Sequence, residues 1–130
     1  MILGYVIGTV NGVLIGHKFL GGSPTSRSAL TLAALSAIRS FCLDALDEPI
    51  EQVSGGKNQI SLACGGQLMV AVFSSVNTAV AMRLAKKYLD LVQQKLKNKK
   101  VTVSSPTLRE TVSDELGKLD QEIEQLNSAN

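Results

Sequence analysis

The sequence predicts an α+β fold with elements in the order ββαβββα, a five-stranded antiparallel sheet packed with helices, plus a C-terminal helix. Three observations predict it. Asn11-Gly12, a strong hairpin signal, separates two β-branched apolar runs. A stretch without Gly or Pro, rich in Ala and Leu, extends from Thr25 to Leu46. Two glycine pairs, Gly55-Gly56 and Gly65-Gly66, then separate three short apolar runs.

The N-terminal half is predicted as a hairpin followed by a loop and a helix. The two strands cover about 2–10 and 13–19. Gly4 and Gly8 fall on one face of the first strand, because side chains repeat every two residues, and they leave room for a helix to pack closely. The loop 21–24 precedes the helix, whose first turn Thr25 or Ser26 can cap.

The three runs after the helix are predicted as a meander of short strands, because Gly-Gly links favour tight turns. They cover Ile50 to Ser54, Asn58 to Cys64 and Gln67 to Ser75. The last run is nearly all apolar, as expected for a central strand that is buried on both faces. A second helix follows at about 78–98, with Asn77 or Thr78 as its cap.

The helix from Thr25 to Leu46 carries two apolar stripes, where a surface helix needs one. We expect the first stripe to cover the core of the domain; it comprises Leu30, Ala34, Ala37, Ile38, Phe41 and Ala45. The second comprises Leu32, Leu35, Cys42, Leu43 and Leu46. A chain of 130 residues offers few elements for another layer, so we expect a partner molecule to cover the second stripe. The alternative is a helix buried centrally in its own domain.

The last segment, Thr107 to Leu126, is predicted as an amphipathic helix after a linker at 101–106. Its apolar residues follow the a/d spacing of a coiled coil: Val112, Leu116, Leu119, Ile123 and Leu126. So short a coiled coil is marginal by itself. The segment can dock on the domain, pair with a copy of itself or fold on a partner, with docking slightly ahead. The predicted organisation is a domain at 1–100, the linker, and the helix at 107–130.

Charge is divided unevenly along the chain. Residues 1–106 carry a net charge of +6 and residues 107–130 a net charge of −4, against +2 for the whole. With three Phe, two Tyr and no Trp, the chain has few rings on which single-stranded nucleic acid could stack.

Only Cys42 and Cys64 are cysteines, both at apolar positions, so buried thiols and a cytoplasmic setting are expected. No signal peptide, transmembrane helix or stable membrane insertion is predicted.

Residues for catalysis do not converge in this sequence. The single histidine, His17, lies on a predicted strand, where a structural or surface role is expected. No zinc-binding, nucleophile-elbow, phosphate-loop or dinucleotide motif occurs. We therefore predict no enzyme activity, no cofactor and no metal. A remaining alternative is a basic surface for nucleic acid or anionic lipid, made by Lys86, Lys87, Lys95, Lys97, Lys99 and Lys100. We expect the lysines of the last helical turn to serve the helix dipole instead.

Particular stretches resemble the roadblock/longin superfamily of profilin-like domains. The segment 11–18, NGVLIGHK, is similar to the start of the second roadblock strand. The segment 29–38, ALTLAALSAI, resembles the Ala-rich middle helix, and 68–77, leading into Arg83 and Leu84, resembles the passage from last strand to last helix. The resemblance covers about 2–98. Roadblock proteins usually begin with a helix, whereas here the first strand follows Met1 directly, as in longin domains.

The resemblance implies a non-catalytic module that binds other proteins. Roadblock proteins commonly dimerise through their middle helices and the following strand, and bind or scaffold small Ras-like GTPases. By this analogy the dimer or partner interface comprises Leu32, Leu35, Cys42, Leu46, Ile50, Gln52 and Val53. The partner is a second copy or a related roadblock/longin subunit, and the setting is cytoplasmic or peripheral to endomembranes. The alternative is a longin-type module of vesicle trafficking with a coiled-coil tail. In either case the tail could occupy the position of the N-terminal helix that roadblock proteins usually have.

Overall fold

The computed structural model describes residues 1–20, 25–76 and 78–129, and it confirms the predicted fold class. The elements are β1 (Ile2–Thr9), β2 (Leu14–Phe19), α1 (Thr25–Leu46), β3 (Gln52–Ser54), β4 (Asn58–Gly65), β5 (Leu68–Ser75), α2 (Val80–Lys99), α3 (Leu108–Thr111) and α4 (Ser113–Ser128). The predicted loop at 21–24 and the predicted capping side chains of Thr25, Ser26 and Asn77 lie outside the described part.

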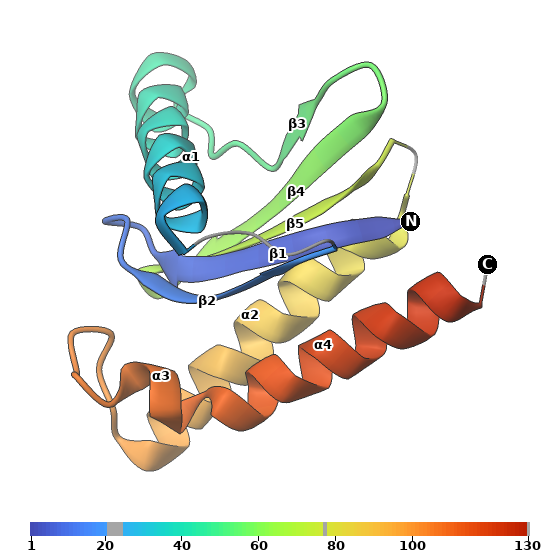
Figure 1. Cartoon of the computed structure of the whole chain (residues 1–130). Helices are drawn as coiled ribbons and strands as arrows, with labels where there is room; N and C mark the ends of the chain where they lie inside the picture. Colours follow the sequence, from blue (N-terminus) through green and yellow to red (C-terminus); the bar gives the residue numbers. More distant parts are fainter. Residues whose placement is uncertain (21–24, 77, 130) are drawn as a thin grey trace.

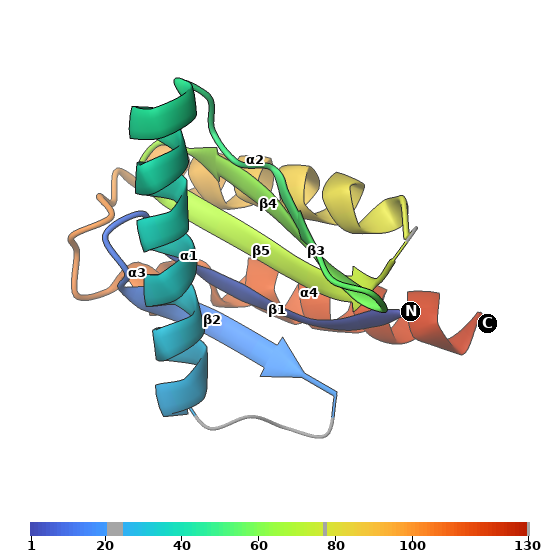
Figure 2. The same ribbon diagram turned by 90° about the horizontal axis from the view of Figure 1, so that it is seen from above.

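The five strands form one antiparallel sheet in the order β2-β1-β5-β4-β3. The apolar strand β5 is central, as its sequence predicts, and nearly all of it is buried. One face of the sheet is crossed by α1, and the other is covered by α2 and α4 lying side by side (Figures 1 and 2). The molecule therefore has three layers, with one helix above the sheet and two long helices below it.

Two turns fix the strand register. In the β1–β2 turn, Gly12 adopts a φ of 93°, which favours glycine, and the Thr9 N–H donates to the Val13 carbonyl at 2.9 Å. The β4–β5 turn has Gly66 and Gln67 at its centre, with φ of 55° and 68°. The prediction placed Gly65-Gly66 there and is wrong by one residue. A two-residue turn of this kind needs positive φ at both positions, and here a glutamine supplies the second.

The larger core lies between the sheet and the α2–α4 layer. Tyr5, Ile7 and Ile15 point into it from β1 and β2 and are buried with side chains of both helices. Gly16 of β2 allows a close approach, since a Cβ there would lie 2.8 Å from Leu116 of α4. The tail therefore packs against β1 and β2, while α2 packs on β4 and β5.

The tail forms two helices where one was predicted. The helix is interrupted at Val112, whose φ of −102° and ψ of 10° are not helical and separate α3 from α4. Val112 and Leu119 are fully buried, Ile123 is nearly so, and Leu116 and Leu126 pack partly buried against the same core. Docking on the domain is confirmed, so the face predicted for a coiled coil is occupied within the chain. The division at 1–100 and 107–130 stays a prediction.

Candidate partner-binding surface

The two apolar stripes of α1 are oriented opposite to the prediction. Leu32 and Leu35, predicted for a partner, are 0% and 3% exposed and pack on the chain's own sheet with Val6 and Met69. The stripe predicted for the core faces outward. The physical reason is a close fit, because a Cβ at Gly8 would clash with the Leu32 side chain. Gly8 on β1 thus leaves room for a helix to pack closely, as predicted, and the side chain that fills this room is that of Leu32.

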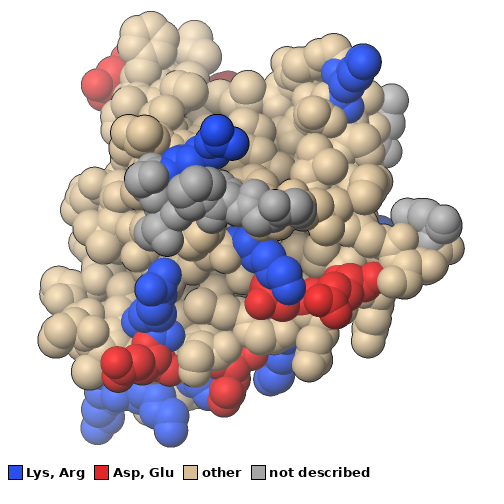
Figure 3. Space-filling model, in the orientation of Figure 1, with Lys and Arg blue, Asp and Glu red and all other residues tan. Residues whose placement is uncertain are grey.

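The outward face of α1 is a large exposed apolar surface. Leu30 is 72% exposed, Phe41 70%, Leu46 65% and Ile38 40%. Ala34, Ala37 and Ala45 are exposed between them. Charged side chains gather over the lower helices in Figure 3, while the part of the surface formed by α1 is mostly uncharged. An apolar face of this kind is typical of a protein–protein contact.

The remaining residues predicted for an interface lie at or near one sheet edge. Leu46 is exposed and Cys42 is half-buried at the C-terminal half of α1. Gln52 is exposed on β3, Ile50 and Val53 are half-buried, and β3 is an edge strand. The structure brings these residues to one side of the molecule, and an edge strand is a template for pairing with another chain.

Polar contacts hold α1 on the sheet. The Ser28 hydroxyl lies 3.0 Å from Nδ1 of His17 on β2, and Ser28 is buried. Farther along α1, the Ser36 hydroxyl donates to the Val10 carbonyl in the β1–β2 turn. The single histidine therefore takes part in positioning a helix, a role that only the three-dimensional pairing with Ser28 reveals. These contacts fix which side of α1 faces outward.

Both cysteines are free, and the surroundings of Cys64 do not suit nucleophilic chemistry. Burial raises the pKa of the Cys64 thiol, while the neighbouring Arg39 guanidinium acts in the opposite direction. A raised pKa disfavours the thiolate, which is the reactive form. Cys42 and Cys64 are half-buried, less than the sequence predicts. In the described ranges 1–20, 25–76 and 78–129, no group of three or more His, Cys, Asp or Glu side chains could hold a metal ion.

Specific hydrogen bonds attach α4 to the opposite face. The Tyr5 hydroxyl donates to Asp120 at 2.8 Å, and the Asn127 side chain both accepts from the Ile2 N–H at 2.9 Å and donates to the Ile2 carbonyl at 2.8 Å. Burial and this bond to Asp120 raise the pKa of Tyr5 far above its usual range. The docked tail is thus held by both apolar burial and directional bonds.

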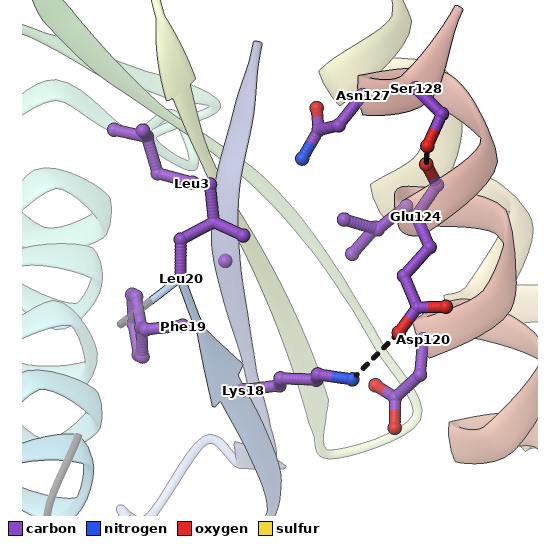
Figure 4. Close-up of a pocket in the computed structure, with 10 residues that line it drawn as sticks. Leu3, Lys18, Phe19, Leu20, Asp120, Glu124, Asn127 and Ser128 are labelled. Carbon is purple, nitrogen blue, oxygen red and sulfur yellow. Dashed lines mark hydrogen bonds and ion pairs between the residues drawn. The ribbon is translucent and has the colours of Figure 1, made fainter. Parts of the chain in front are cut away.

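A cleft of about 350 Å³ opens between the β1–β2 edge and α4, where the side chains of Leu3, Phe19 and Leu20 lie across from those of α4 (Figure 4). Its mouth holds Lys18, which approaches Glu124 at 3.4 Å. A cleft of this size can accept a small ligand. Lys18 and Glu124 pair with each other, however, and Asp120 accepts a hydrogen bond from Tyr5, so the cleft's chemistry favours no particular ligand.

The basic residues of α2 are partly neutralised by the tail. Lys87 forms an ion pair with Glu122 at 2.7 Å, and Lys95 lies 3.7 Å from Glu115. Lys97, Lys99 and Lys100 remain exposed at the end of α2. The acidic tail thus pairs with two of the six lysines considered for a basic surface, and the absence of nucleic-acid binding stays a prediction.

By length and composition, α1 also qualifies as a membrane-crossing helix. The stretch Arg27–Leu46 has a mean hydropathy of 1.5, and 11% of its most apolar window is buried in the molecule. A helix that docks on a protein partner meets the same test. The absence of stable membrane insertion stays a prediction.

No family model matches the sequence. No curated protein matches it either. Solved structures do match the fold. A Roadblock/LC7 domain from Streptomyces avermitilis superposes with a TM-score of 0.59 at 16% identity, covering 74% of this chain and 86% of that one. Myxococcus xanthus MglB gives 0.54 at 15% identity, covering 75% and 85%. A third structure, MglB with a tetrameric arrangement, gives 0.53 at 10% identity, covering 88% and 80%.

The chain has the roadblock/longin fold. In roadblock terms, α1 is the middle helix and β3 is the strand that follows it. The tail helix α4 lies beside α2 on one face of the sheet and packs against β1 there.

Proposed function

We propose that the chain is a non-catalytic, dimeric scaffold in the cytoplasm that binds a small Ras-like GTPase. One observation supports this most strongly. The middle helix of a roadblock fold presents Leu30, Phe41 and their apolar neighbours to solvent. Roadblock proteins commonly dimerise through this helix and bind such GTPases, and the MglB structure with a tetrameric arrangement is an assembly of a chain with the same fold. The GTPase comes from the family resemblance alone.

The proposed dimer surface differs from the surface that the sequence predicts. Leu32 and Leu35 belong to the core of the protomer, so the outward side chains of α1 replace them. The edge strand β3 completes the surface, with Val53 and Gln52 beside the free side of the sheet. Pairing of two copies there would cover an edge that otherwise invites association with other chains.

The dimer is tested by light scattering on the full chain. We expect twice the protomer mass for the wild type and the protomer mass for Phe41→Glu, because a charge in the contact disfavours association. Gln94→Glu adds the same charge on the exposed side of α2 and should leave the dimer intact. A wild-type protomer mass at all concentrations would contradict the dimer.

The GTPase half is tested separately. The full chain is mixed with a panel of purified small Ras-like GTPases, each loaded with GDP or with a non-hydrolysable GTP analogue, and applied to a sizing column. Co-elution with at least one of them in one nucleotide state is expected. If none binds in either state, the GTPase half of the proposal fails while the dimer and the fold remain.

A second candidate is a longin-type module of vesicle trafficking, favoured by one observation. The tail docks on its own domain through Val112, Leu119 and Ile123, as a longin-type module with an intramolecular tail contact requires. A full chain that stays monomeric, with α4 protected from hydrogen exchange, would favour this candidate over the dimer.

A further inference from the structure

The sheet carries polar side chains on its α2-facing side, near the β3 edge, where apolar side chains would be expected. Gln59 and Ser61 of β4 are 8% and 1% exposed, and the next residue on that face, Ala63, belongs to the core beneath α2. Gln52 of β3 lies directly opposite Ser61 in the strand register. Buried polar side chains cost free energy unless they are hydrogen-bonded, so a core of this composition weakens the fold.

These side chains line a cleft of about 300 Å³ at the first turn of α2. The other lining residues are Thr78, Ala79 and Met82, and none of the six lining residues is charged. The Gln59 side chain accepts a hydrogen bond from Nε2 of Gln52 at 3.2 Å and donates one to the Thr78 carbonyl at 3.2 Å. These bonds connect β3, β4 and the start of α2 around the cleft.

The Ser61 hydroxyl has no partner in this arrangement. It lines the cleft, and no hydrogen bond joins it to a side chain or to the backbone within the described ranges 1–20, 25–76 and 78–129. A buried hydroxyl without a partner destabilises a protein, because it gives up water without compensation. A ligand that bonds to this hydroxyl in the cleft would supply the missing partner.

The start of α2 adds positive potential to the same cleft. A helix of 20 residues has the positive end of its dipole at its first turn, together with N–H groups that need acceptors. Its N-cap residue, Ala79, has no side-chain oxygen, and its first turn contains no acidic residue. Thr78, expected as a cap, donates its hydroxyl to the Ser75 carbonyl at 2.7 Å instead. Among the described residues, no side chain therefore supplies the oxygen that usually caps a helix start.

We propose that the cleft between β3, β4 and the start of α2 binds a small ligand through an oxyanion, either a phosphoryl or a carboxylate group. The anionic oxygens accept hydrogen bonds from the first-turn N–H groups and from the Ser61 hydroxyl. Helix N-termini favour such groups in general, and no acidic side chain lines the cleft to repel one. Binding here requires neither the proposed dimer nor the GTPase.

A titration of the isotopically labelled full chain, followed by NMR, tests the site. Inorganic phosphate and acetate are added separately at constant ionic strength. We expect saturable shifts of the Val80, Ala81 and Met82 amide resonances, with a dissociation constant of about 1–10 mM because no lining residue carries a positive charge. The probe that binds more tightly identifies the oxyanion class. If neither probe gives saturable shifts at these residues, the proposal fails.

Ser61→Ala separates ligand binding from stability. Removing a hydroxyl without a partner should leave Tm unchanged or slightly higher, whereas the affinity for the bound probe should fall about tenfold because a bond to the anion is lost. Ser104→Ala makes the same change at an exposed position in the linker and should alter neither quantity. A lower Tm with unchanged affinity would show that the hydroxyl serves the fold, and would overturn its place in the site.

Ala79→Asp tests the helix end. A carboxylate at the N-cap itself accepts from the first-turn N–H groups, so this variant should raise Tm by about 3 °C and abolish the shifts caused by phosphate or acetate. Gln94→Asp adds the same charge at an exposed position farther along α2 and should retain wild-type binding. Wild-type affinity in Ala79→Asp would overturn the proposal. Neither Ser61 nor Ala79 belongs to the proposed dimer surface, so a failed dimer leaves this test intact.

Discussion

The α2–α4 face of the sheet and its α1 face differ in the number of covering helices and in how completely they are covered (Figures 1 and 2). On the α2–α4 face, Tyr5, Ile7 and Ile15 are fully buried and the tail is attached by hydrogen bonds to the backbone of Ile2. On the other face, α1 inserts Leu32 and Leu35 and leaves Leu30, Phe41 and Leu46 exposed. The chain thus covers one face completely and leaves apolar side chains exposed on the other, which is the face that we propose a partner covers.

The largest expected effect is on the completed face. Leu119→Asp places a charge at a fully buried position between α4 and the sheet, so we expect a loss of roughly 4 kcal/mol or more in the free energy of unfolding, with undocking of the tail. Urea denaturation and binding of a hydrophobic dye measure it. The neighbouring Lys118→Asp is exposed and should change little. Similar stability for both variants would mean that the tail contributes little to the fold.

A smaller effect distinguishes the two sides of α1. Leu32→Ala should lower the free energy of unfolding by about 2–5 kcal/mol, because it leaves a cavity against Gly8 and Met69. Leu30→Ala removes the same atoms from an exposed position and should change it by less than about 0.5 kcal/mol at low chain concentration. Chemical denaturation of both variants measures the difference. Equal losses would show that both sides of α1 are buried in the protomer.

The smallest expected effect concerns the hydrogen bond from Tyr5 to Asp120. Tyr5→Phe should lower the free energy of unfolding by about 1–2 kcal/mol at pH 8. The folded chain holds the pKa of Tyr5 above the usual value near 10, so above that pH the unfolded chain loses the proton while the folded chain keeps it. This contribution therefore declines as pH rises. The difference between wild type and variant should shrink above pH 10, and a constant difference would contradict the assigned cause.

Much of the fold could be predicted from local signals. Asn11-Gly12 marks its hairpin correctly, and the apolar run of β5 identifies the central strand. The turn after β4 was misplaced by one residue because Gly66 alone does not show which neighbour shares its positive φ. Here Gln67 adopts that conformation, since the pairing of Gly65 with Leu68 leaves those two residues to form the turn.

The orientation of α1 could not be predicted from periodicity. The helix is apolar on nearly all sides, so helical spacing yields two stripes and gives no reason to prefer either. The choice depends on tertiary fit, in which Leu32 enters the space above Gly8 and Ser28 contacts His17 on β2. Both contacts join residues of α1 to residues of the sheet that are distant from them in the sequence. The presence of a surplus apolar stripe was predicted correctly. The prediction of which stripe faces the sheet was wrong, because Leu32 and Leu35 are buried while Leu30 and Phe41 are exposed.

The tail shows a different limit. Its apolar spacing predicts the buried residues Val112, Leu119 and Ile123, but the same spacing suits a coiled coil equally well. Docking follows from partners on the sheet, since Gly16 makes room for Leu116 and the Tyr5 hydroxyl meets Asp120. A sequence pattern predicts which face of a helix is buried. The surface against which that face packs depends on complementary residues elsewhere in the chain.

The double hydrogen bond between Asn127 and Ile2 has a consequence for the order of synthesis. It joins residues 125 positions apart, and the start of β1 and the end of α4 lie near each other in Figure 1. The ribosome delivers β1 early, whereas the helix that covers it emerges more than a hundred residues later. Throughout that interval the apolar surface of β1 and β2 that α4 later covers stays exposed on the nascent chain. We expect chaperones to bind the chain during this interval.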